Sequence, residues 1–556
     1  MNVTPHTPED HPAEIGMIRK PWADQIKVGL FYPNHYGLAM SNLGFQTIYR
    51  LFNREPDVIC ERFLADTPVL SPGANLLSRE NRRPARDFDI LAFSIAFEND
   101  YPHILRLLDA SEMPLEARNR GPEAPLVMAG GVAVMLNPEP LAAFFDLFLI
   151  GEAEATLPAF LERYRRAGDR RALLDQIPLA VPGAYVPSHY QPSYHPNGPL
   201  ATFTAAEDRV ARVKSPKPAD VATLKTATTI LTPDTTFADT CLIEVSRGCP
   251  HGCRFCSAGY IYRPPRYRHP RFLEACLREA ARTTHRVGLV GAAVSDYPGL
   301  GELCAQVKDT GLRLSFSSLR ADALTDELLA VLRANRTKTA TIAPEAGSPR
   351  LRRVINKGLA EEDILQAAEK LVRAGIPNLK LYFMVGLPTE TDDDSHAIVT
   401  LCEKIKSVFL DASRKMKRIG TLTVNATPFV PKPATPFQWV AMAPPRMLKK
   451  RIRTLRKKLA RIANVRFQNE SVREAYVQAL LARGDRRVAR ILRQHHQMGG
   501  GWPSTLKAAT IDTDFFTLRE RPRHELLPWD FIDTGVSRDF LWREYQRALA
   551  LKPTDP

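Results

Sequence analysis

Cysteine is scarce in this sequence, and long apolar runs are missing. Eight cysteines in 556 residues are too few for a disulfide scaffold. No run reaches the roughly 18 to 20 apolar residues of a membrane span, and even residues 140–151 are interrupted by Asp146. The N-terminal residues contain acids and no apolar segment, so no secretory signal is predicted. We therefore expect a soluble, cytoplasmic protein.

Length and composition narrow the class of protein. A chain of 556 residues exceeds one ordinary domain and suggests two to four domains of roughly 150 residues. Hydrophobic residues make up 44% and charged residues 25%, which excludes disordered, collagen-like and coiled-coil chains. The 76 Lys and Arg residues exceed the 61 Asp and Glu residues, for a net charge of +15. This surplus permits an anionic partner but describes association rather than fold.

Three of the cysteines form a dense cluster. Cys249, Cys253 and Cys256 lie within eight residues, as C-x3-C-x2-C. A closed zinc site takes four ligands, commonly as two pairs, and the sequence holds no second pair, although His251 offers a fourth ligand. Three thiolates in one loop favour an iron–sulfur cluster with one iron open to a substrate or cofactor. The other five cysteines stand singly and are expected to be small buried side chains in a reducing compartment: Cys60, Cys241, Cys276, Cys304 and Cys402.

The cluster motif and its aromatic residue resemble a known superfamily. Cys249-x3-Cys253-x-Phe255-Cys256 is similar to the radical S-adenosylmethionine (SAM) signature. The resemblance implies a 4Fe-4S cluster on the three cysteines, SAM on the open iron, and a reductant protein such as flavodoxin or ferredoxin. It also implies one-electron cleavage of SAM to methionine and a 5'-deoxyadenosyl radical that abstracts a hydrogen atom. The protein's part is to orient the cofactor and exclude competing reactions.

A repeating strand and helix pattern follows the cluster. Six apolar, β-rich runs alternate with helical patterns, which fits a partial (β/α)6 radical SAM barrel over residues 238–440. Such barrels place their chemistry at the carboxyl ends of the strands, and the cluster loop begins four residues after the first run. The runs are 241–245, 287–294, 312–317, 337–343, 379–385 and 421–426.

The resemblance also implies SAM contacts after the later strands. The candidates are Phe255 in the cluster loop, then Gly291 and Ser295, then Ser317 and Arg320, and finally Glu345. Many members carry a Gly-Gly-Glu segment at the position of Gly291, but the acid is not at the usual place here.

Structural roles compete with several of these assignments. Asp296 either substitutes for the displaced acid or caps the following helix. Arg320 either holds the SAM carboxylate or pairs with Asp322 or Asp326. Glu345 either contacts SAM or is a buried acid paired with Arg320 or Lys380. The segment Gly386-Leu-Pro-Thr-Glu-Thr391 resembles a Gly-Leu-Pro-Glu-Thr element of cobalamin-associated members, and we assign it a structural turn.

The residues before the barrel predict a second α/β unit. After an extension over 1–25, four strand-like runs at 26–33, 89–97, 124–131 and 145–154 indicate a Rossmann-like, doubly wound domain over 26–200, joined to the barrel by a linker over 201–237. Ser94, Gly130-Gly131 and Gly151-Glu-Ala-Glu154 resemble cobalamin-binding domains. The cobalt-ligating motif D-x-H-x-x-G is absent, and His35 is not assigned as a ligand. Cobalamin binding and service as a lid or substrate shelf both stay open.

A strongly basic segment opens the region 441–556, which we expect to be small, basic and mainly helical. Residues 446–466 hold ten Lys or Arg and no acid, and apolar residues recur at steps of four and three, which predicts a basic amphipathic helix. Three interpretations follow: a solvated helix packed on the barrel, binding to the phosphates of RNA, or contact with an anionic membrane surface.

Longer segments resemble one subfamily of uncharacterised bacterial radical SAM proteins with a cobalamin-binding-like N-terminal domain. They are 256–266, 427–439 and 527–535. The sequence therefore predicts an enzyme that cleaves SAM and starts radical chemistry, such as methylation or methylthiolation, on an unidentified substrate, with RNA as one candidate. The alternative is a non-catalytic iron–sulfur binding or assembly protein. It would bind a cluster without cleaving SAM.

Overall fold

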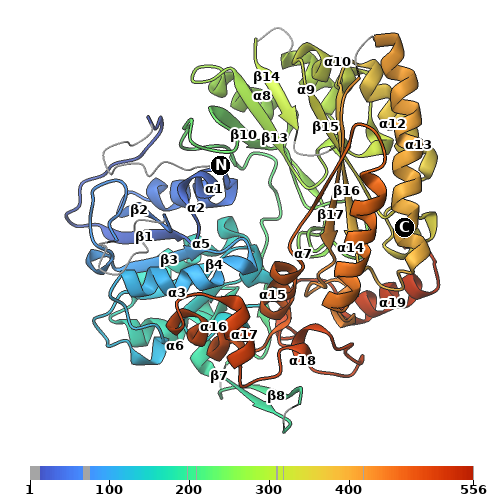
Figure 1. The fold of residues 1–556 in the computed structure, drawn as a ribbon. Helices are drawn as coiled ribbons and strands as arrows, with labels where there is room; N and C mark the ends of the chain where they lie inside the picture. Colours follow the sequence, from blue (N-terminus) through green and yellow to red (C-terminus); the bar gives the residue numbers. More distant parts are fainter. Residues whose placement is uncertain are drawn as a thin grey trace.

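The chain folds around two parallel β-sheets with a helical C-terminal region beside both (Figure 1). The computed structural model describes residues 13–66, 76–196, 198–207, 209–307, 311–316, 319–416 and 419–554. The α/β class predicted from the sequence is confirmed. The domain limits proposed above stay predictions.

The N-terminal sheet has the strand order β2-β1-β3-β4-β5-β6. Its members are β1 (Ile26–Tyr32), β2 (Val58–Leu64), β3 (Ile90–Ser94), β4 (Leu126–Gly130), β5 (Leu147–Leu149) and β6 (Ala184–Tyr185). The first five strands pair in parallel and β6 pairs antiparallel to β5. The order 2-1-3-4-5 is that of doubly wound folds, in which ligands bind beyond the carboxyl ends of the strands where the order reverses.

Strand β2 was not predicted because its sequence, VICERFL, carries charge at its centre. The structure explains how that charge is buried. The Arg62 guanidinium pairs with Glu80 at 2.6 Å and with Glu14 at 2.7 Å, and all three side chains are almost fully buried. Paired charges can occupy a protein interior that an unpaired charge cannot.

Helices cover both faces of this sheet. One face packs against α2 (Leu43–Arg54), α5 (Ala153–Arg166) and α6 (Arg170–Ala180). The other face packs against α3 (Tyr101–Ala110) and against the C-terminal helix α16 (Val488–Gln497), which lies along α3 (Figure 1). The C-terminal region therefore completes the core of the N-terminal sheet.

The second half of the chain forms an open barrel of parallel strands. One sheet holds β10 (Thr240–Glu244), β13 (Arg286–Val290) and β14 (Arg313–Phe316). A second sheet holds β15 (Thr339–Glu345), β16 (Asn378–Val385), β17 (Leu422–Pro428) and β18 (Val465–Asn469), and a bridge between Leu319 and Ile342 connects the two. All six predicted strands are present. The structure adds β18, which pairs in parallel with β17 after the basic helix.

Helices lie outside this barrel and bury one face of its strands. On β16 the residues Leu379, Leu381, Phe383 and Val385 are buried and belong to a core shared with α12 (Glu361–Arg373) and α13 (Asp392–Met416). The alternate residues of β16 are only half-buried and lie on the inner face of the sheet. The alternation follows from the twofold period of a strand.

The basic segment is a helix packed on the barrel, α14 (Pro445–Leu459). Its apolar stripe, Leu448, Ile452, Leu455 and Leu459, is buried, as predicted. The helix ends at Leu459, so the prediction of a helix to residue 466 is wrong: Arg466 lies in β18. A turn at 460–464 intervenes because the chain reverses to lay β18 beside β17.

The Gly386 turn fastens this helix to the barrel. Gly386 has a φ of +91°, and a Cβ there would stand 2.6 Å from Leu448 Cδ2. Arg451 of α14 is buried and lies 3.3 Å from the Glu390 carboxylate at the end of the same turn. The turn therefore has the structural role assigned to it from the sequence.

The segments 427–439 and 527–535, which resemble one subfamily, form packing contacts. The Trp529 indole donates to the Gln438 amide oxygen at 2.7 Å, and Trp439 meets Trp542 of α19 (Arg538–Leu549) edge to face. The Lys432 ammonium group lies 2.6 Å from the buried carboxylate of Glu98, a residue that follows β3 in the chain. These contacts join the barrel, the C-terminal region and the N-terminal sheet. Within the described residues, no helix is long and apolar enough to cross a membrane.

Candidate functional site

The three-cysteine loop follows β10 at the carboxyl end of the barrel. Cys253 is buried, and Cys249 and Cys256 are half-buried. Backbone N–H groups point at two of the sulfurs: that of His251 at Cys249, and those of Ala258 and Gly259 at Cys256. Across the described residues, no three His, Cys, Asp or Glu side chains converge as ligands of a single ion. A four-iron cluster takes each thiolate on a different iron, so its ligands need not converge on one point.

Burial and nearby positive charge act in opposite directions on the thiols of the loop. Burial raises the pKa of all three thiols, and raises that of Cys253 to about 12. Lys357 and Arg320 act in the opposite direction on Cys253. Cations and N–H donors around soft sulfur ligands stabilise a charged metal–thiolate group, and metal binding displaces the thiol protons. The donor set therefore fits an iron–sulfur cluster.

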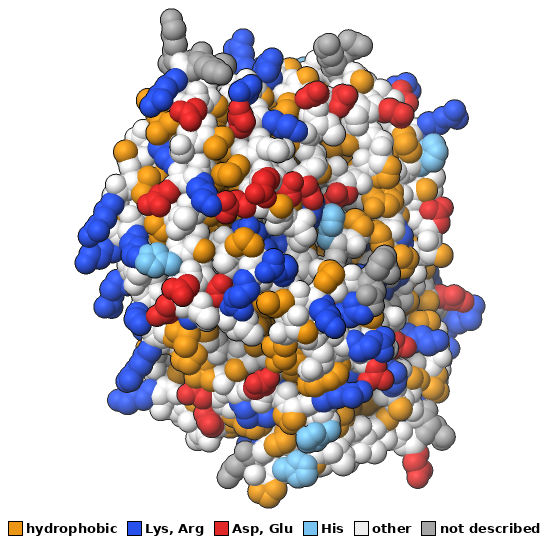
Figure 2. Space-filling model, turned by 90° about the vertical axis from the view of Figure 1, so that its right-hand side faces the viewer, with side chains coloured by type: hydrophobic (Ala, Val, Ile, Leu, Met, Phe, Trp, Pro, Cys, Tyr) orange, Lys and Arg blue, Asp and Glu red, His pale blue; other side chains and the backbone are white. Residues whose placement is uncertain are grey.

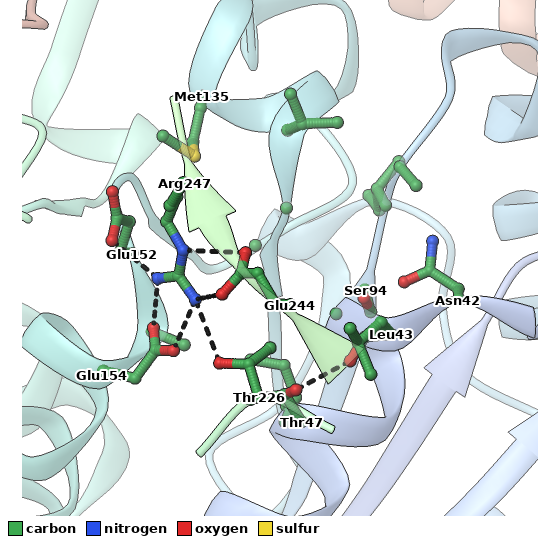
Figure 3. Close-up of a pocket in the computed structure, with 18 of the residues that line it drawn as sticks. Asn42, Leu43, Thr47, Ser94, Met135, Glu152, Glu154, Thr226, Glu244 and Arg247 are labelled. Carbon is green, nitrogen blue, oxygen red and sulfur yellow. Dashed lines mark hydrogen bonds and ion pairs between the residues drawn. The ribbon is translucent and has the colours of Figure 1, made fainter. Parts of the chain in front are cut away.

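Two arginines hold the loop from opposite sides, and the first is Arg247, two residues before Cys249. Its guanidinium lies 2.7 Å from Glu152 and 2.9 Å from both Glu154 and Glu244 (Figure 3). Glu152 and Glu154 begin α5 of the N-terminal sheet, whereas Glu244 ends β10. Arg266, on the strand paired with that of Arg247, also binds Glu152. The N-terminal unit thus fixes the start of the cluster loop.

The second arginine is Arg254, which follows Cys253 and is fully buried. It lies 3.2 Å from Glu544 of α19 and donates to the backbone carbonyls of Arg353, Val354 and Lys552. The C-terminal helix therefore holds the centre of the loop. Sequence reasoning missed both arginines because the partners that join them to the flanking regions, Glu152 and Glu544, lie roughly 100 and 290 residues away in the chain.

The predicted SAM contacts lie at the carboxyl ends of consecutive strands. Gly291 follows β13, and a Cβ there would stand 2.7 Å from the Ser246 hydroxyl beside the cluster loop. The Ser295 hydroxyl accepts from the Arg320 backbone N–H at 3.4 Å, so two of the candidates touch. Phe255 is partly buried against the core shared with the N-terminal sheet. Ser317 lies outside the described residues. Roles for these residues in SAM binding stay predictions.

The charged candidates have protein partners. Arg320 pairs with Asp322 at 2.7 Å, one of the two pairings considered from the sequence. Asp296 pairs with His251 of the cluster loop at 2.9 Å rather than capping a helix. Glu345 pairs with Lys357 at 3.2 Å, so the expected pairing with Arg320 or Lys380 is wrong. Lys357 follows the next helix and returns to the loop, a contact that the strand pattern does not reveal.

Glu345 also has an unusual backbone. Its φ is +65°, and the register of β15 against β16 shifts just before it. A left-handed conformation at a residue with a side chain costs of order 1–3 kcal/mol and is concentrated at functional sites. Burial raises the pKa of Glu345, while Lys357 acts to lower it. The left-handed position therefore places an acid at the end of β15, close to the cysteines. Glu345 acts to raise the pKa of the Cys256 thiol and Lys357 acts to lower it, so both charges lie near that thiol.

A cavity of about 560 Å³ lies between the two sheets, next to this loop. Strand ends of the N-terminal sheet line one side, including Ser94, Gly130 and Gly151. Glu244 and Arg247 of the barrel line the other side (Figure 3). Gly291 also belongs to that lining. His35 is not among the described residues that line it. The cavity thus occupies the carboxyl end of both sheets, where each kind of fold binds ligands.

Comparison with known proteins identifies the family. Residues 243–402 match the family described as the radical SAM superfamily, and residues 44–187 match that described as radical SAM proteins, N-terminal. An uncharacterized protein of Methanocaldococcus jannaschii is 32% identical over 468 residues, which cover 84% of this chain and 90% of that protein. The chain belongs to the radical SAM superfamily and is an enzyme. Membership implies a 4Fe-4S cluster, SAM and an external reductant.

Further matches are partial or remote. A tRNA-2-methylthio-N(6)-dimethylallyladenosine synthase of Carboxydothermus hydrogenoformans is 26% identical over 204 residues, 34% of this chain and 46% of the synthase. Among solved structures, the methyltransferase TsrM of Kitasatospora setae matches with a TM-score of 0.43 at 12% identity, covering 76% of this chain and 78% of TsrM. The cobalamin-dependent enzyme OxsB matches with a TM-score of 0.42 at 14% identity, covering 78% and 62%.

The Arg254 contact yields a stability prediction. Arg254→Ala removes one of the two cations that pair with the buried Glu544 carboxylate, although Arg547 still lies 3.6 Å from it. Breaking a buried pair costs about 3–5 kcal/mol, and we expect the lower end of that range. We expect denaturant unfolding to show that loss, and reconstituted protein to contain less iron because the loop is no longer held. Arg278→Ala, which breaks the exposed pair with Glu274, is the matched control and is expected to cost under about 1 kcal/mol. Equal stability of the two variants would refute the anchoring role.

Proposed function

We propose that this enzyme cleaves SAM at a cluster held by Cys249, Cys253 and Cys256, and that the cavity between the sheets holds cobalamin for methyl transfer. One observation carries the proposal: the cavity joins the carboxyl end of the N-terminal sheet to the start of the cluster loop. Ligands of both units would meet there. When bound, the cluster supplies the electron that cleaves SAM to methionine and a 5'-deoxyadenosyl radical.

The chain's own residues do the positioning. Arg247 and Arg254 fix the loop that presents the three thiolates. Arg320 stands at the next strand end with a guanidinium suited to the SAM carboxylate, and Asp322 orients it. The acid of the Gly-Gly-Glu segment is absent after β13. Glu345 takes its role in this proposal, because its carboxylate suits the SAM ammonium group. Lys357 keeps that carboxylate oriented beside Cys256.

The lining of the cavity supports binding of a large organic cofactor that has both apolar and polar groups. Its walls combine apolar side chains with a few polar groups, among them Asn42, Thr47 and Ser94 (Figure 3). Small residues at the ends of β3, β4 and β5 leave room above the sheet. The sequence resemblance to cobalamin-binding domains lies at these positions. Bound cobalamin would supply a transferable methyl group, and here it would bind without a histidine ligand from the position of His35.

The central test is SAM cleavage. Anaerobic protein reconstituted with iron and sulfide, then reduced with dithionite in the presence of SAM, is expected to form 5'-deoxyadenosine, measured by chromatography. Cys256→Ala removes one ligand and is expected to abolish the product. If wild type forms a cluster but gives neither 5'-deoxyadenosine nor S-adenosylhomocysteine, even after cell extract is added as a source of substrate, the proposal fails.

Cobalamin uptake is tested separately. Wild-type protein is expected to retain cobalamin through anaerobic gel filtration, detected by its visible absorption. Ser94→Phe places a ring in the cavity wall and should weaken binding at least tenfold, equivalent to about 1.4 kcal/mol. Ser193→Phe, on an exposed strand, makes the same change away from the cavity and should bind as wild type does. Wild type that retains no cobalamin would remove methyl transfer from the proposal and leave SAM cleavage standing.

A second proposal concerns the substrate. We propose that it is RNA and that the basic face of α14 binds it. Lys449, Arg453 and Lys457 follow one face at steps of four and are all exposed. On the side of the molecule in Figure 2, Lys and Arg gather along the left-hand edge and are mixed with acids elsewhere. The partial match to a tRNA methylthiotransferase supports the same substrate class.

RNA binding through this face predicts a salt dependence. Replacing Lys449, Arg453 and Lys457 with Glu should reduce the slope of log affinity against log salt by about 0.7 to 0.9 for each phosphate that the protein no longer neutralises. Filter binding of total tRNA at several salt concentrations measures the slope. The control triple, Arg282→Glu, Arg286→Glu and Arg313→Glu, changes exposed cations at the opposite end of the barrel strands. Equal slopes for both triples would exclude α14 as the RNA site.

A further inference from the structure

The inner face of the barrel sheet carries a row of hydrogen-bond donors. The buried residues of β16 and β17 face the helices, so the alternate residues face inward. In register, Thr341 of β15, Lys380 of β16, Thr423 of β17 and Arg466 of β18 stand side by side. Tyr382 and Asn425 form the next row toward the carboxyl end. Two cations, a phenol, an amide and two hydroxyls thus share one face of the sheet.

Acids do not balance these cations. In β15 to β18 the single acid is Glu345, and it is already paired with Lys357. Among the described residues no carboxylate lies within 4.0 Å of the Lys380 ammonium group, whose described contact is the Tyr382 ring at 5.2 Å. A half-buried ammonium group without a counter-charge is costly unless an anion or water approaches it.

Asn425 gives an independent sign of an absent partner. Its side-chain amide nitrogen is buried and meets no acceptor among the described residues. Buried amide groups are nearly always hydrogen-bonded, and an unsatisfied one calls for a specific explanation. Asn425 stands opposite Tyr382 and one inward-facing position from the Lys380 row. An acceptor placed between these side chains would satisfy the ammonium, phenol and amide donors together.

We propose that this surface binds an anionic group of the substrate, a carboxylate or a phosphate, through Lys380, Tyr382 and Asn425. The proposal rests on the proposed function, because it takes the inner face of the barrel as the substrate side of that site. Lys380 lies five residues before the end of β16, or about 16 Å below the strand ends at 3.3 Å per residue. The substrate would be an elongated molecule whose charged end is remote from the reacting carbon. Binding energy at a remote group can orient the reacting part.

The test uses matched small anions on the reconstituted protein with SAM present. Phenyl phosphate and benzoate share a ring and differ in the anion, and benzyl alcohol is the neutral probe. Isothermal titration calorimetry is expected to show binding of at least one anion and none of the alcohol. Preference for phenyl phosphate or for benzoate identifies the anion class. Failure of both anions to bind wild type would overturn the proposal.

Variants assign the binding to these residues. Lys380→Met keeps the length of the side chain and should weaken the preferred anion at least tenfold, whereas Lys380→Arg should restore most of the affinity. Asn425→Asp, an isosteric change, adds a repelling charge and should weaken it further. Lys404→Met, at an exposed lysine on the outer helix α13, is the control and should bind as wild type does. Equal affinity of wild type, Lys380→Met and Asn425→Asp would refute the site.

The same preparations separate this inference from the proposed function. Anion binding is measured without turnover, and 5'-deoxyadenosine is measured without the probes. Anion binding that depends on Lys380 in a protein that never cleaves SAM would refute the proposed function alone. SAM cleavage in a protein that binds neither anion would refute the inner-face site alone.

Discussion

The site depends on how one loop is held. A loop that holds three thiols for a metal cluster must be rigid, partly buried and surrounded by positive charge at the same time. Arg247 and Arg254 meet these demands from opposite directions, one through acids of the N-terminal sheet and the other through Glu544 of the C-terminal helix. Both of these acid sources lie outside the barrel, although Glu244 at the end of β10 also pairs with Arg247. The barrel provides the strand ends, and the flanking regions hold the loop in place.

The sequence predicted what depends on local pattern. Periodic apolar residues located all six expected barrel strands and the buried stripe of α14, and the cysteine spacing located the cluster loop. The prediction failed where distant partners decide the outcome. Strand β2 is charged at its centre and is buried only because Glu80 and Glu14 neutralise Arg62. Glu345 pairs with Lys357 because the chain returns to the loop after a helix, which no strand pattern records.

The long shared motifs illustrate the same limit. Residues 427–439 and 527–535 are rich in Pro and aromatic residues, a composition that suits either a binding surface or a packed joint. The structure shows the joint: Gln438 binds Trp529, and Trp439 packs on Trp542. By contrast, Asn425, whose amide nitrogen is unsatisfied, and Lys380, whose ammonium group lies over the Tyr382 ring, are found in ordinary strand sequence. Their potential for binding becomes evident only when the register places them side by side.

The shared use of Glu152 couples two places that ligands would occupy. This carboxylate lines the cavity, and it also pairs with Arg247 at the root of the cysteine loop. A ligand that shifts Glu152 must change the free energy of the loop, and assembly of metal on the loop must change affinity in the cavity by the same factor. Such reciprocity is a thermodynamic requirement and needs no large movement. The order in which a cavity ligand and the cluster metal bind would then affect the rate of assembly, while the final affinities remain linked.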